Sequence, residues 1–363
     1  MPNYLDMDDS LTPGLKGVKL SNGTKYELTY RTLKNKPCFR KDGPAEVYLE
    51  ETVIPGISTV PYLLFSSNAP FTLGTKYGLN NDGTLEYSTD IENWDEWNGS
   101  AIQSVNNAVY LRGTENTSFQ VDDEGNPVIF EINTSGNNGV RCLGNIENLL
   151  DYATVARGEH PTMGNYHCFY QMFQDCTALT TAPELHAMTL ANGCYEAMFS
   201  GCTSLTSAPV LPATTLAPWC YANMFFECTS LTEASELPAT TLTEGCYNSM
   251  FYGCTSLTVA PDIPATTVAS GCCQNMFNGC SSLICPPELH ALQLEYGCYG
   301  WMFVNCSSIR LSDTQTDVYT MPYRIPTSGT GINAEEALAM MFDGTGGPVQ
   351  IPSINTTYYL AVN

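Results

Sequence analysis

Apolar and polar positions follow two different patterns in two parts of the chain. Upstream of about residue 135, β-favouring runs such as "TLEYSTD", "NAVYLRGT" and "PVIFEIN" alternate with turns rich in Gly, Asn and Asp. Short alternating runs bounded by such turns predict the strands of a small all-β sandwich or barrel. We therefore expect an all-β domain over residues 26–135, as one domain or two small subdomains, preceded by an extended arm at residues 1–25.

Further along the chain the pattern repeats every 26 residues. Met-Phe pairs recur at this step from Met172-Phe173 to Met302-Phe303. Two series of cysteines keep the same step: Cys168, Cys194, Cys220, Cys246, Cys272 and Cys298; and Cys176, Cys202, Cys228, Cys254, Cys280 and Cys306. A fixed period of this length marks units that bury their apolar faces only by stacking on their neighbours. The pattern predicts a solenoid whose coils each contain one short strand, about 4.8 Å from the next.

The repeat "MFxGCTSLTxAPxLPATTL" resembles the leucine-rich repeats of the BspA-like group, which is found in surface proteins of gut bacteria and in their phages. The resemblance covers residues 142 to about 311. It implies a solenoid of strands and loops, usually in adhesion or recognition, and it supplies no catalytic residue. Upstream, "GTLEYSTDIENWDEW" followed by "VYLRGT" more weakly resembles the β domain that often precedes these repeats.

The fold class expected from these patterns is mainly β. An N-terminal β-sandwich-like domain is followed by a leucine-rich-repeat solenoid over residues 136–311. Its first unit, "RCLGNIENLL", is a degenerate repeat that caps the array. Residues 312–363 hold an insertion and then "MMFDGTGGPVQIPSIN", which echoes the repeat and predicts a second capping segment.

The regular cysteines have three explanations. Disulfides require an oxidising compartment, and the start "MPNYLDMDDSLTPGLKG" contains neither the basic nor the apolar part of a secretory signal. Zinc sites use paired ligands at short spacing, which neither Cys272-Cys273 nor His186 and His290 supply. A free cysteine packs as a small hydrophobe, and a position repeated in every coil must fit its own copies above and below. We expect both series to form a buried ladder of thiols, with some disulfides as the alternative.

Positions that differ between otherwise constant coils are the candidates for binding. Trp219 replaces the glycine that precedes the first-series cysteine in most coils, and an acidic residue recurs after the proline slot. Exposed aromatic patches commonly mark contact surfaces, so we expect a binding face, with the filling of grooves between coils as the alternative. The candidates are Trp219, Phe226, Tyr252, Tyr296, Trp301, Glu184, Glu236, Asp262 and Glu288.

Two acidic stretches upstream of the repeats have ordinary structural explanations. In "DIENWDEW", residues 90–97, tryptophans and acids could contact a sugar. A glycosidase, however, needs two carboxyl groups that face each other across a cleft, and closeness in sequence does not provide that. The stretch "VDDEGN", residues 121–126, lacks the spacing of an EF-hand loop and predicts a hairpin turn. We expect no catalytic residue, no metal and no cofactor.

Charge is distributed unevenly along the chain, whose formal net charge is −23. Residues 1–76 hold nine Lys and Arg against eight acids, whereas residues 77–363 hold five Arg against 29 acids. An acidic surface repels phosphate backbones, so we expect no nucleic-acid partner. No apolar run approaches the roughly 20 residues that span a bilayer, so we expect no membrane insertion.

Together these patterns favour a non-enzymatic phage virion protein, a fibre or decoration on head or tail, that displays the solenoid for host recognition or adhesion. The arm and the β domain would contact other virion proteins. The solenoid would meet a host-surface glycan or protein, in several copies or as a homo-oligomer. The alternative is a bacterial cell-surface adhesin, and a lesser one is a glycan-acting enzyme with the repeats as accessory.

Overall fold

The computed structural model describes residues 60–361, apart from residues 120, 123, 137, 165, 292, 326–333 and 354–355, and the backbone of three short strands nearer the N-terminus. The chain forms two compact units, Met1–Gly56 and Ile57–Ala361. In the first unit β1 (Gly17–Lys19), β2 (Lys25–Leu28) and β3 (Phe39–Arg40) form one antiparallel sheet. The rest of the predicted arm, and the rest of residues 26–59 at the start of the predicted β domain, lie outside the described residues.

The second unit begins with two sheets, and the prediction of a mainly β chain is confirmed. One sheet has the order β10-β5-β8 and the other β12-β11-β4-β9-β6-β7. Buried and half-buried residues alternate along the seven residues of β9, as expected when one face covers a core. The strands of this β domain are β4 (Leu63–Ser67), β5 (Phe71–Thr75), β6 (Thr84–Ser88), β7 (Asp95–Glu96), β8 (Ile102–Gln103), β9 (Ala108–Thr114), β10 (Phe130–Thr134) and β11 (Val140–Leu143).

The larger sheet continues directly into the repeats. Strand β11 pairs antiparallel with β4 and parallel with β12 (Leu179–Thr181), which belongs to the first coil. Helix α1 (Asn148–Ala156) follows β11 and packs on β9. It is interrupted at Asp151, whose carboxylate accepts hydrogen bonds from the N–H groups of Ala153 and Thr154 at 3.0 and 3.3 Å. Because β11 has a partner on both sides, the first coil is covered by the β domain.

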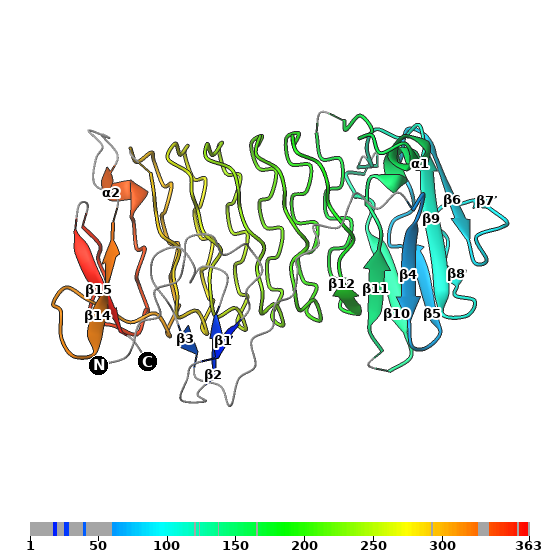
Figure 1. Cartoon of the computed structure of the whole chain (residues 1–363). Coiled ribbons are helices and arrows are strands. Elements are labelled where there is room, and N and C mark those ends of the chain that lie inside the picture. Colours follow the sequence, from blue (N-terminus) through cyan, green and yellow to red (C-terminus); the bar gives the residue numbers. More distant parts are fainter. Residues whose placement is uncertain are drawn as a thin grey trace. The chain divides into compact units, whose positions relative to one another are not determined.

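Each 26-residue unit forms one coil, and successive coils lie side by side (Figure 1). Around each Met-Phe pair the backbone makes consecutive tight turns, and its N–H groups use two kinds of acceptor in alternation. Those of Tyr195, Ala197, Phe199 and Gly201 donate to carbonyl oxygens of the next coil at 2.8–3.0 Å. The N–H groups between them donate within their own coil, as from Met198 to Tyr195 at 3.2 Å. The turns thus hydrogen-bond both along the chain and across the stack.

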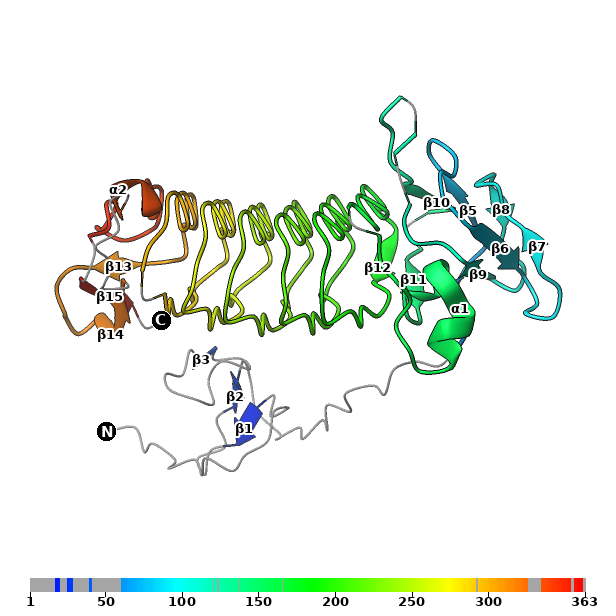
Figure 2. The same cartoon turned by 90° about the horizontal axis from the view of Figure 1, so that it is seen from above.

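We call residues 192–204, and the equivalent turn segments of the other coils, the turn edge. In Figure 2 these tight turns follow one edge of the stack, and long arms connect them to the opposite edge. The arms and the opposite edge contain the proline-rich segments, which bridge to their copies at Thr189 and Thr215, and at Ile263 and Leu289. The turn edge and the proline-rich segments are therefore separate surfaces of the stack, formed by different residues of each repeat.

Identical residues stack on one another inside the coils. Phenylalanines of successive coils have ring centroids 5.3–5.9 Å apart. Stacked rings at this spacing attract each other in addition to burying apolar area. The column consists of Phe173, Phe199, Phe225, Phe251, Phe277, Phe303 and Phe342. Each member is buried, which is why the same residue recurs in every coil.

The C-terminal segment closes the stack by imitating a coil. Helix α2 (Ala334–Ala337) leads into Met341 and Phe342, and Phe342 takes the next place in the phenylalanine column. The N–H groups of Tyr299 and Phe303 donate to the carbonyl oxygens of Ala337 and Met341 at 2.9 and 3.0 Å. A last antiparallel sheet lies beside it, in the order β13 (Leu311–Ser312), β15 (Thr357–Ala361), β14 (Tyr319–Arg324).

Candidate binding surface of the coil stack

The turn edge contains recurring positions with positive φ. One of them precedes the first-series cysteine, and φ there is +57° to +60° at the glycines of four coils, Gly193, Gly245, Gly271 and Gly297. Trp219 occupies this position with φ +58°, and Trp301 has φ +56° at the next such position of its own coil. A left-handed conformation costs a residue with a side chain about 1–2 kcal/mol. Two predicted binding residues are therefore held in strained backbone where glycine would fit without strain.

The indole of Trp219 lies flat on Gly245 of the next coil. A methyl group on Gly245 would lie 2.5 Å from Cε3 and 2.6 Å from Cδ2 and Cζ3 of Trp219. Near-equal distances to three adjacent ring atoms place that methyl over the face of the six-membered ring and not at its rim. Gly245 thus leaves the space that the indole fills, and the Trp219 residue as a whole is 41% exposed.

The other predicted aromatic residues of the turn edge are less uniform. Phe226 and Tyr252 stack on each other with ring centroids 4.6 Å apart and planes at 7°, and both are half-buried. Trp301 is also half-buried, and its indole N–H donates to the sulfur of Met340 at 3.3 Å. Tyr296 is 53% exposed. The three half-buried rings differ from the expected exposure because Phe226 and Tyr252 pack on each other across adjacent coils, and Trp301 packs on Met340 of the C-terminal segment.

The predicted acids lie in the proline-rich segments, apart from the aromatic residues. Glu184 is half-buried, and its Oε2 lies 3.0 Å from Nε2 of His186. His290 brings two acids together, because its Nε2 lies 3.9 Å from both Asp262 Oδ2 and Glu288 Oε2. Glu236 is exposed on the coil between these groups. The nine predicted residues therefore form two separate sets, one on the turn edge and one on the proline-rich segments.

Both cysteine series lie in the interior as free thiols. Second-series thiols of successive coils donate to the carbonyl oxygen of a phenylalanine 29 residues earlier, as from Cys228 to Phe199 and from Cys254 to Phe225, both at 3.1 Å. Burial raises the pKa of Cys228 and of Cys306 to about 12. Since the thiolate is the reactive form, these cysteines are poor nucleophiles and poor metal ligands in the folded chain.

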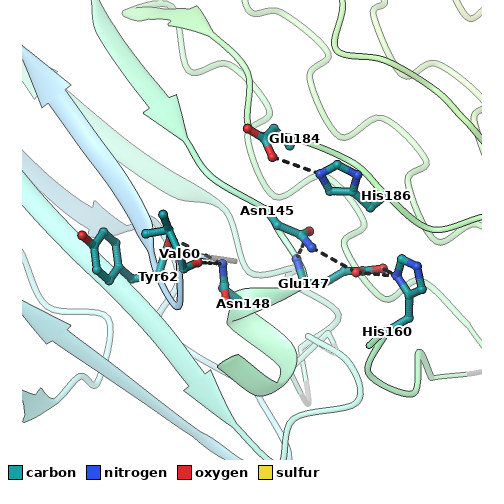
Figure 3. A network of polar contacts seen from close by, with 8 residues as sticks. All are labelled: Val60, Tyr62, Asn145, Glu147, Asn148, His160, Glu184 and His186. Atoms are coloured by element: carbon teal, nitrogen blue, oxygen red, sulfur yellow. Dashed lines mark hydrogen bonds and ion pairs between the residues drawn. The ribbon is translucent and has the colours of Figure 1, made fainter. Parts of the chain in front are cut away.

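A polar network at the junction of the β domain and the first coil was not predicted (Figure 3). Glu147 is 1% exposed, and its carboxylate lies 2.8 Å from Nδ1 of His160 and 3.2 Å from the side-chain amide of Asn145. The N–H of Ile146 donates to the carbonyl oxygen of Glu184 at 3.0 Å. The sequence contains no spacing signal for this site, because its partners come from the turn before α1, the loop after α1 and the first coil. Its contacts hold the β domain on the stack.

A polar cavity of about 580 Å³ lies beside β7 in the β domain, lined in part by Tyr87, Asp95 and Glu96. Asp90, which also lines it, accepts hydrogen bonds from the backbone and side chain of Asn93, and these lower its pKa to about 2. Trp97 is 4% exposed, and its indole N–H donates to the carbonyl oxygen of Ser100 at 2.8 Å. This tryptophan therefore packs inward, and only a small part of it reaches the cavity.

The second tryptophan of that stretch, Trp94, is covered by a cation. The guanidinium carbon of Arg112 lies 4.0 Å from the Trp94 ring centroid and 4.4 Å from that of Tyr152. At the same time Nε of Arg112 donates to Glu86 Oε2 at 2.7 Å. A guanidinium held between an aromatic face and a carboxylate combines cation–π attraction with a charge-assisted hydrogen bond.

In the stretch at residues 121–126, the described residues on either side of residue 123 approach each other closely. The N–H of Asp122 donates to the carbonyl oxygen of Asn126 at 2.9 Å, and the Asn126 side chain donates to the Asp122 carboxylate and lowers its pKa. Across the part of the chain that the structure describes, no group of three or more His, Cys, Asp and Glu side chains is arranged to hold a metal ion. Nor does that part contain a helix long and apolar enough to cross a bilayer.

In comparisons with known proteins, no family model, no curated protein and no solved structure matches this chain.

Proposed function

We propose that this chain is a non-enzymatic bacteriophage virion protein that displays a BspA-like leucine-rich-repeat solenoid for contact with the host surface. The observation that carries the proposal is the contrast within each coil. Phe225, Phe251 and the cysteines stack on their own copies in the interior, whereas the turn edge carries a different set of side chains in each coil. Outward positions that vary on a constant frame are suited to recognition.

The turn edge supplies the aromatic anchors that contact surfaces commonly use. Trp219 and Tyr296 are both substantially exposed, and Phe226 and Tyr252 form a stacked pair on the same edge. Aromatic side chains offer large contact areas at low cost in conformational entropy. Several copies on one particle would turn weak single contacts into firm attachment through effective concentration.

In this proposal the β domain and the N-terminal unit anchor the protein among other virion proteins. Two features support that role. The paired strands β11 and β12 connect the β domain to the first coil through a continuous sheet, which would present the stack in a defined direction. Residues 1–76 are nearly neutral whereas the remainder is strongly acidic, so the two parts suit different surroundings.

The proposal is tested by locating the chain in its source culture. Phage particles are purified, their proteins are identified by mass spectrometry, and the particles are imaged with an antibody against the coil stack. We expect the chain at a constant number of copies per particle, with the antibody at an outer surface. Recovery from bacterial envelopes and not from particles would contradict the virion function and favour a cell-surface adhesin of the same repeat type.

A further inference from the structure

We propose that Trp219 and Glu244 form a receptor for an arginine side chain of a protein partner. This inference rests on the proposed function, because it names the chemistry that the coil stack would meet on another surface. Three observations carry it: the exposed indole that rests on Gly245, the charge of the coils around it, and a complete arrangement of the same kind within the β domain.

The Trp219 indole is built as a platform. One face of the ring lies on Gly245, and with 41% of Trp219 exposed the indole still offers surface to a partner. The platform is maintained against strain, since Trp219 has φ +58° where Gly193, Gly245 and Gly271 occupy the same position. Strained residues are retained where surrounding structure and function require them.

Charge selects a cation for this platform. Residues 158–309 contain no Lys or Arg and eleven Asp and Glu. Glu244 precedes Gly245 and is exposed, and its carbonyl oxygen accepts the N–H of Trp219 at 3.0 Å. The carboxylate of Glu244 therefore belongs to the residue directly before Gly245, on which the indole rests. An aromatic face beside a carboxylate attracts a cation by both cation–π and Coulomb forces.

The β domain contains the completed form of this arrangement. There the guanidinium of Arg112 lies over the Trp94 ring at 4.0 Å while it donates to Glu86 at 2.7 Å. The turn edge supplies the tryptophan and the glutamate but no arginine. Arginine fits better than lysine, because its planar guanidinium can stack on a ring and hydrogen-bond a carboxylate at its edge at the same time.

The test uses the full chain labelled with 5-fluorotryptophan, whose four tryptophans give four fluorine resonances. The Trp219 resonance is assigned with the Trp219→Asn variant. The probes are the peptide acetyl-Gly-Arg-Gly-amide and the same peptide with citrulline, which keeps the planar shape and loses the charge. We expect the arginine peptide to shift the Trp219 resonance saturably, and the citrulline peptide to bind at least fivefold more weakly.

Two alanine variants provide a matched pair. Gly245→Ala and Gly271→Ala both place a methyl group at φ +58°, but the first meets the Trp219 ring at 2.5 Å and the second meets only Gln274 at 3.7 Å. We expect Gly245→Ala to weaken arginine-peptide binding at least fivefold and Gly271→Ala to change it less than twofold. Glu244→Gln should weaken binding about threefold and reduce its dependence on salt.

Equal weakening by the two alanine variants, equal binding of the citrulline peptide, or a response of Trp219 to a neutral sugar in place of the arginine peptide would each overturn this inference. Failure here is distinguishable from failure of the proposed function. If the chain is found on particles but the arginine peptide does not bind, only the receptor is refuted. If the peptide binds but the chain is absent from particles, the receptor stands and the virion function is refuted.

Discussion

The β domain and the coil stack build their cores in different ways. In the β domain Phe130 meets three different neighbours, with ring centroids 5.5 Å from Phe65, 6.1 Å from Trp97 and 5.1 Å from Phe173. In the stack Phe251 meets its own copies, Phe225 and Phe277, both at 5.5 Å. A repeated core requires the same residue in every coil, so a position that varies between coils need not belong to the core. The β domain has no equivalent positions to compare, so the sequence cannot separate its core residues from its surface residues in this way.

Removing a whole coil or part of a coil tests whether the stack depends on its repeat, and this change should have the largest effect on folding. Deletion of residues 246–271 removes one complete period, and the remaining coils can stack on each other with only the loss of one interface. Deletion of residues 246–258 removes half a period and places unlike residues against one another. We expect a cooperative thermal transition for the first variant and loss of folding for the second, measured by circular dichroism. Equal behaviour of the two would show that the stack does not depend on its period.

Alkaline pH should unfold the stack through its thiols. Burial raises the pKa of Cys228 and of Cys306 from 9.0 to about 12, so the unfolded chain loses these protons at lower pH than the folded chain. Their contribution to stability is complete below pH 9 and declines as pH rises towards 12. Each unit of separation corresponds to about 1.4 kcal/mol. We expect the free energy of unfolding to fall steeply across this range, as measured by urea denaturation; a flat profile would contradict the buried ladder.

Truncating one phenylalanine in each region compares the two cores directly. Phe251→Ala and Phe130→Ala should each lower the free energy of unfolding by about 3–5 kcal/mol, the usual cost of removing a buried ring. Phe130→Ala should also change the fluorescence of Trp97, whose ring lies 6.1 Å from it. Phe251→Ala should leave that signal unaltered. A change in Trp97 fluorescence in both variants would indicate that the two cores are one cooperative network.

The cysteine ladder gives the smallest effect. Cys254→Ala removes a buried thiol that donates to the carbonyl oxygen of Phe225 at 3.1 Å. We expect a loss of about 1–2 kcal/mol from the missing hydrogen bond and the small void. Thr203→Ala, at an exposed position of the turn edge, should stay within about 0.5 kcal/mol. An equal loss in both would mean that the thiol contributes no more than a surface residue.

The sequence predicts well which residues fill the interior of the stack, because the 26-residue period shows which positions are equivalent. A spacing of 26 residues identifies Phe199, Phe225 and the cysteines as equivalent, and equivalence under stacking implies burial. The period does not predict the alternating hydrogen bonds of the turn edge or the positive φ of Trp219. Those follow from backbone geometry, and the only hint was that glycine occupies the position in most other coils.

The contacts at the junction and within the β domain could not be predicted from the sequence, for a different reason. The contact of Glu147 with His160 and Asn145 joins segments whose approach depends on the path of α1, which no local pattern specifies. Likewise, the tryptophans of "DIENWDEW" look alike in sequence, yet Trp97 is buried and Trp94 is covered by Arg112. Alternation along a strand predicts which face is buried but not what covers it.

Attachment of the purified, fluorescently labelled chain to host cells tests the central claim that the turn edge makes the contact. The native chain is compared with Trp219→Asn/Tyr296→Ser, which alters two exposed aromatic residues of that edge, and with Glu236→Gln/Asp262→Asn on the proline-rich segments. Both variants must show native circular dichroism. We predict at least tenfold weaker attachment for the turn-edge variant and a smaller change for the other. Undiminished attachment of the turn-edge variant, with loss in the acid variant, would contradict the account.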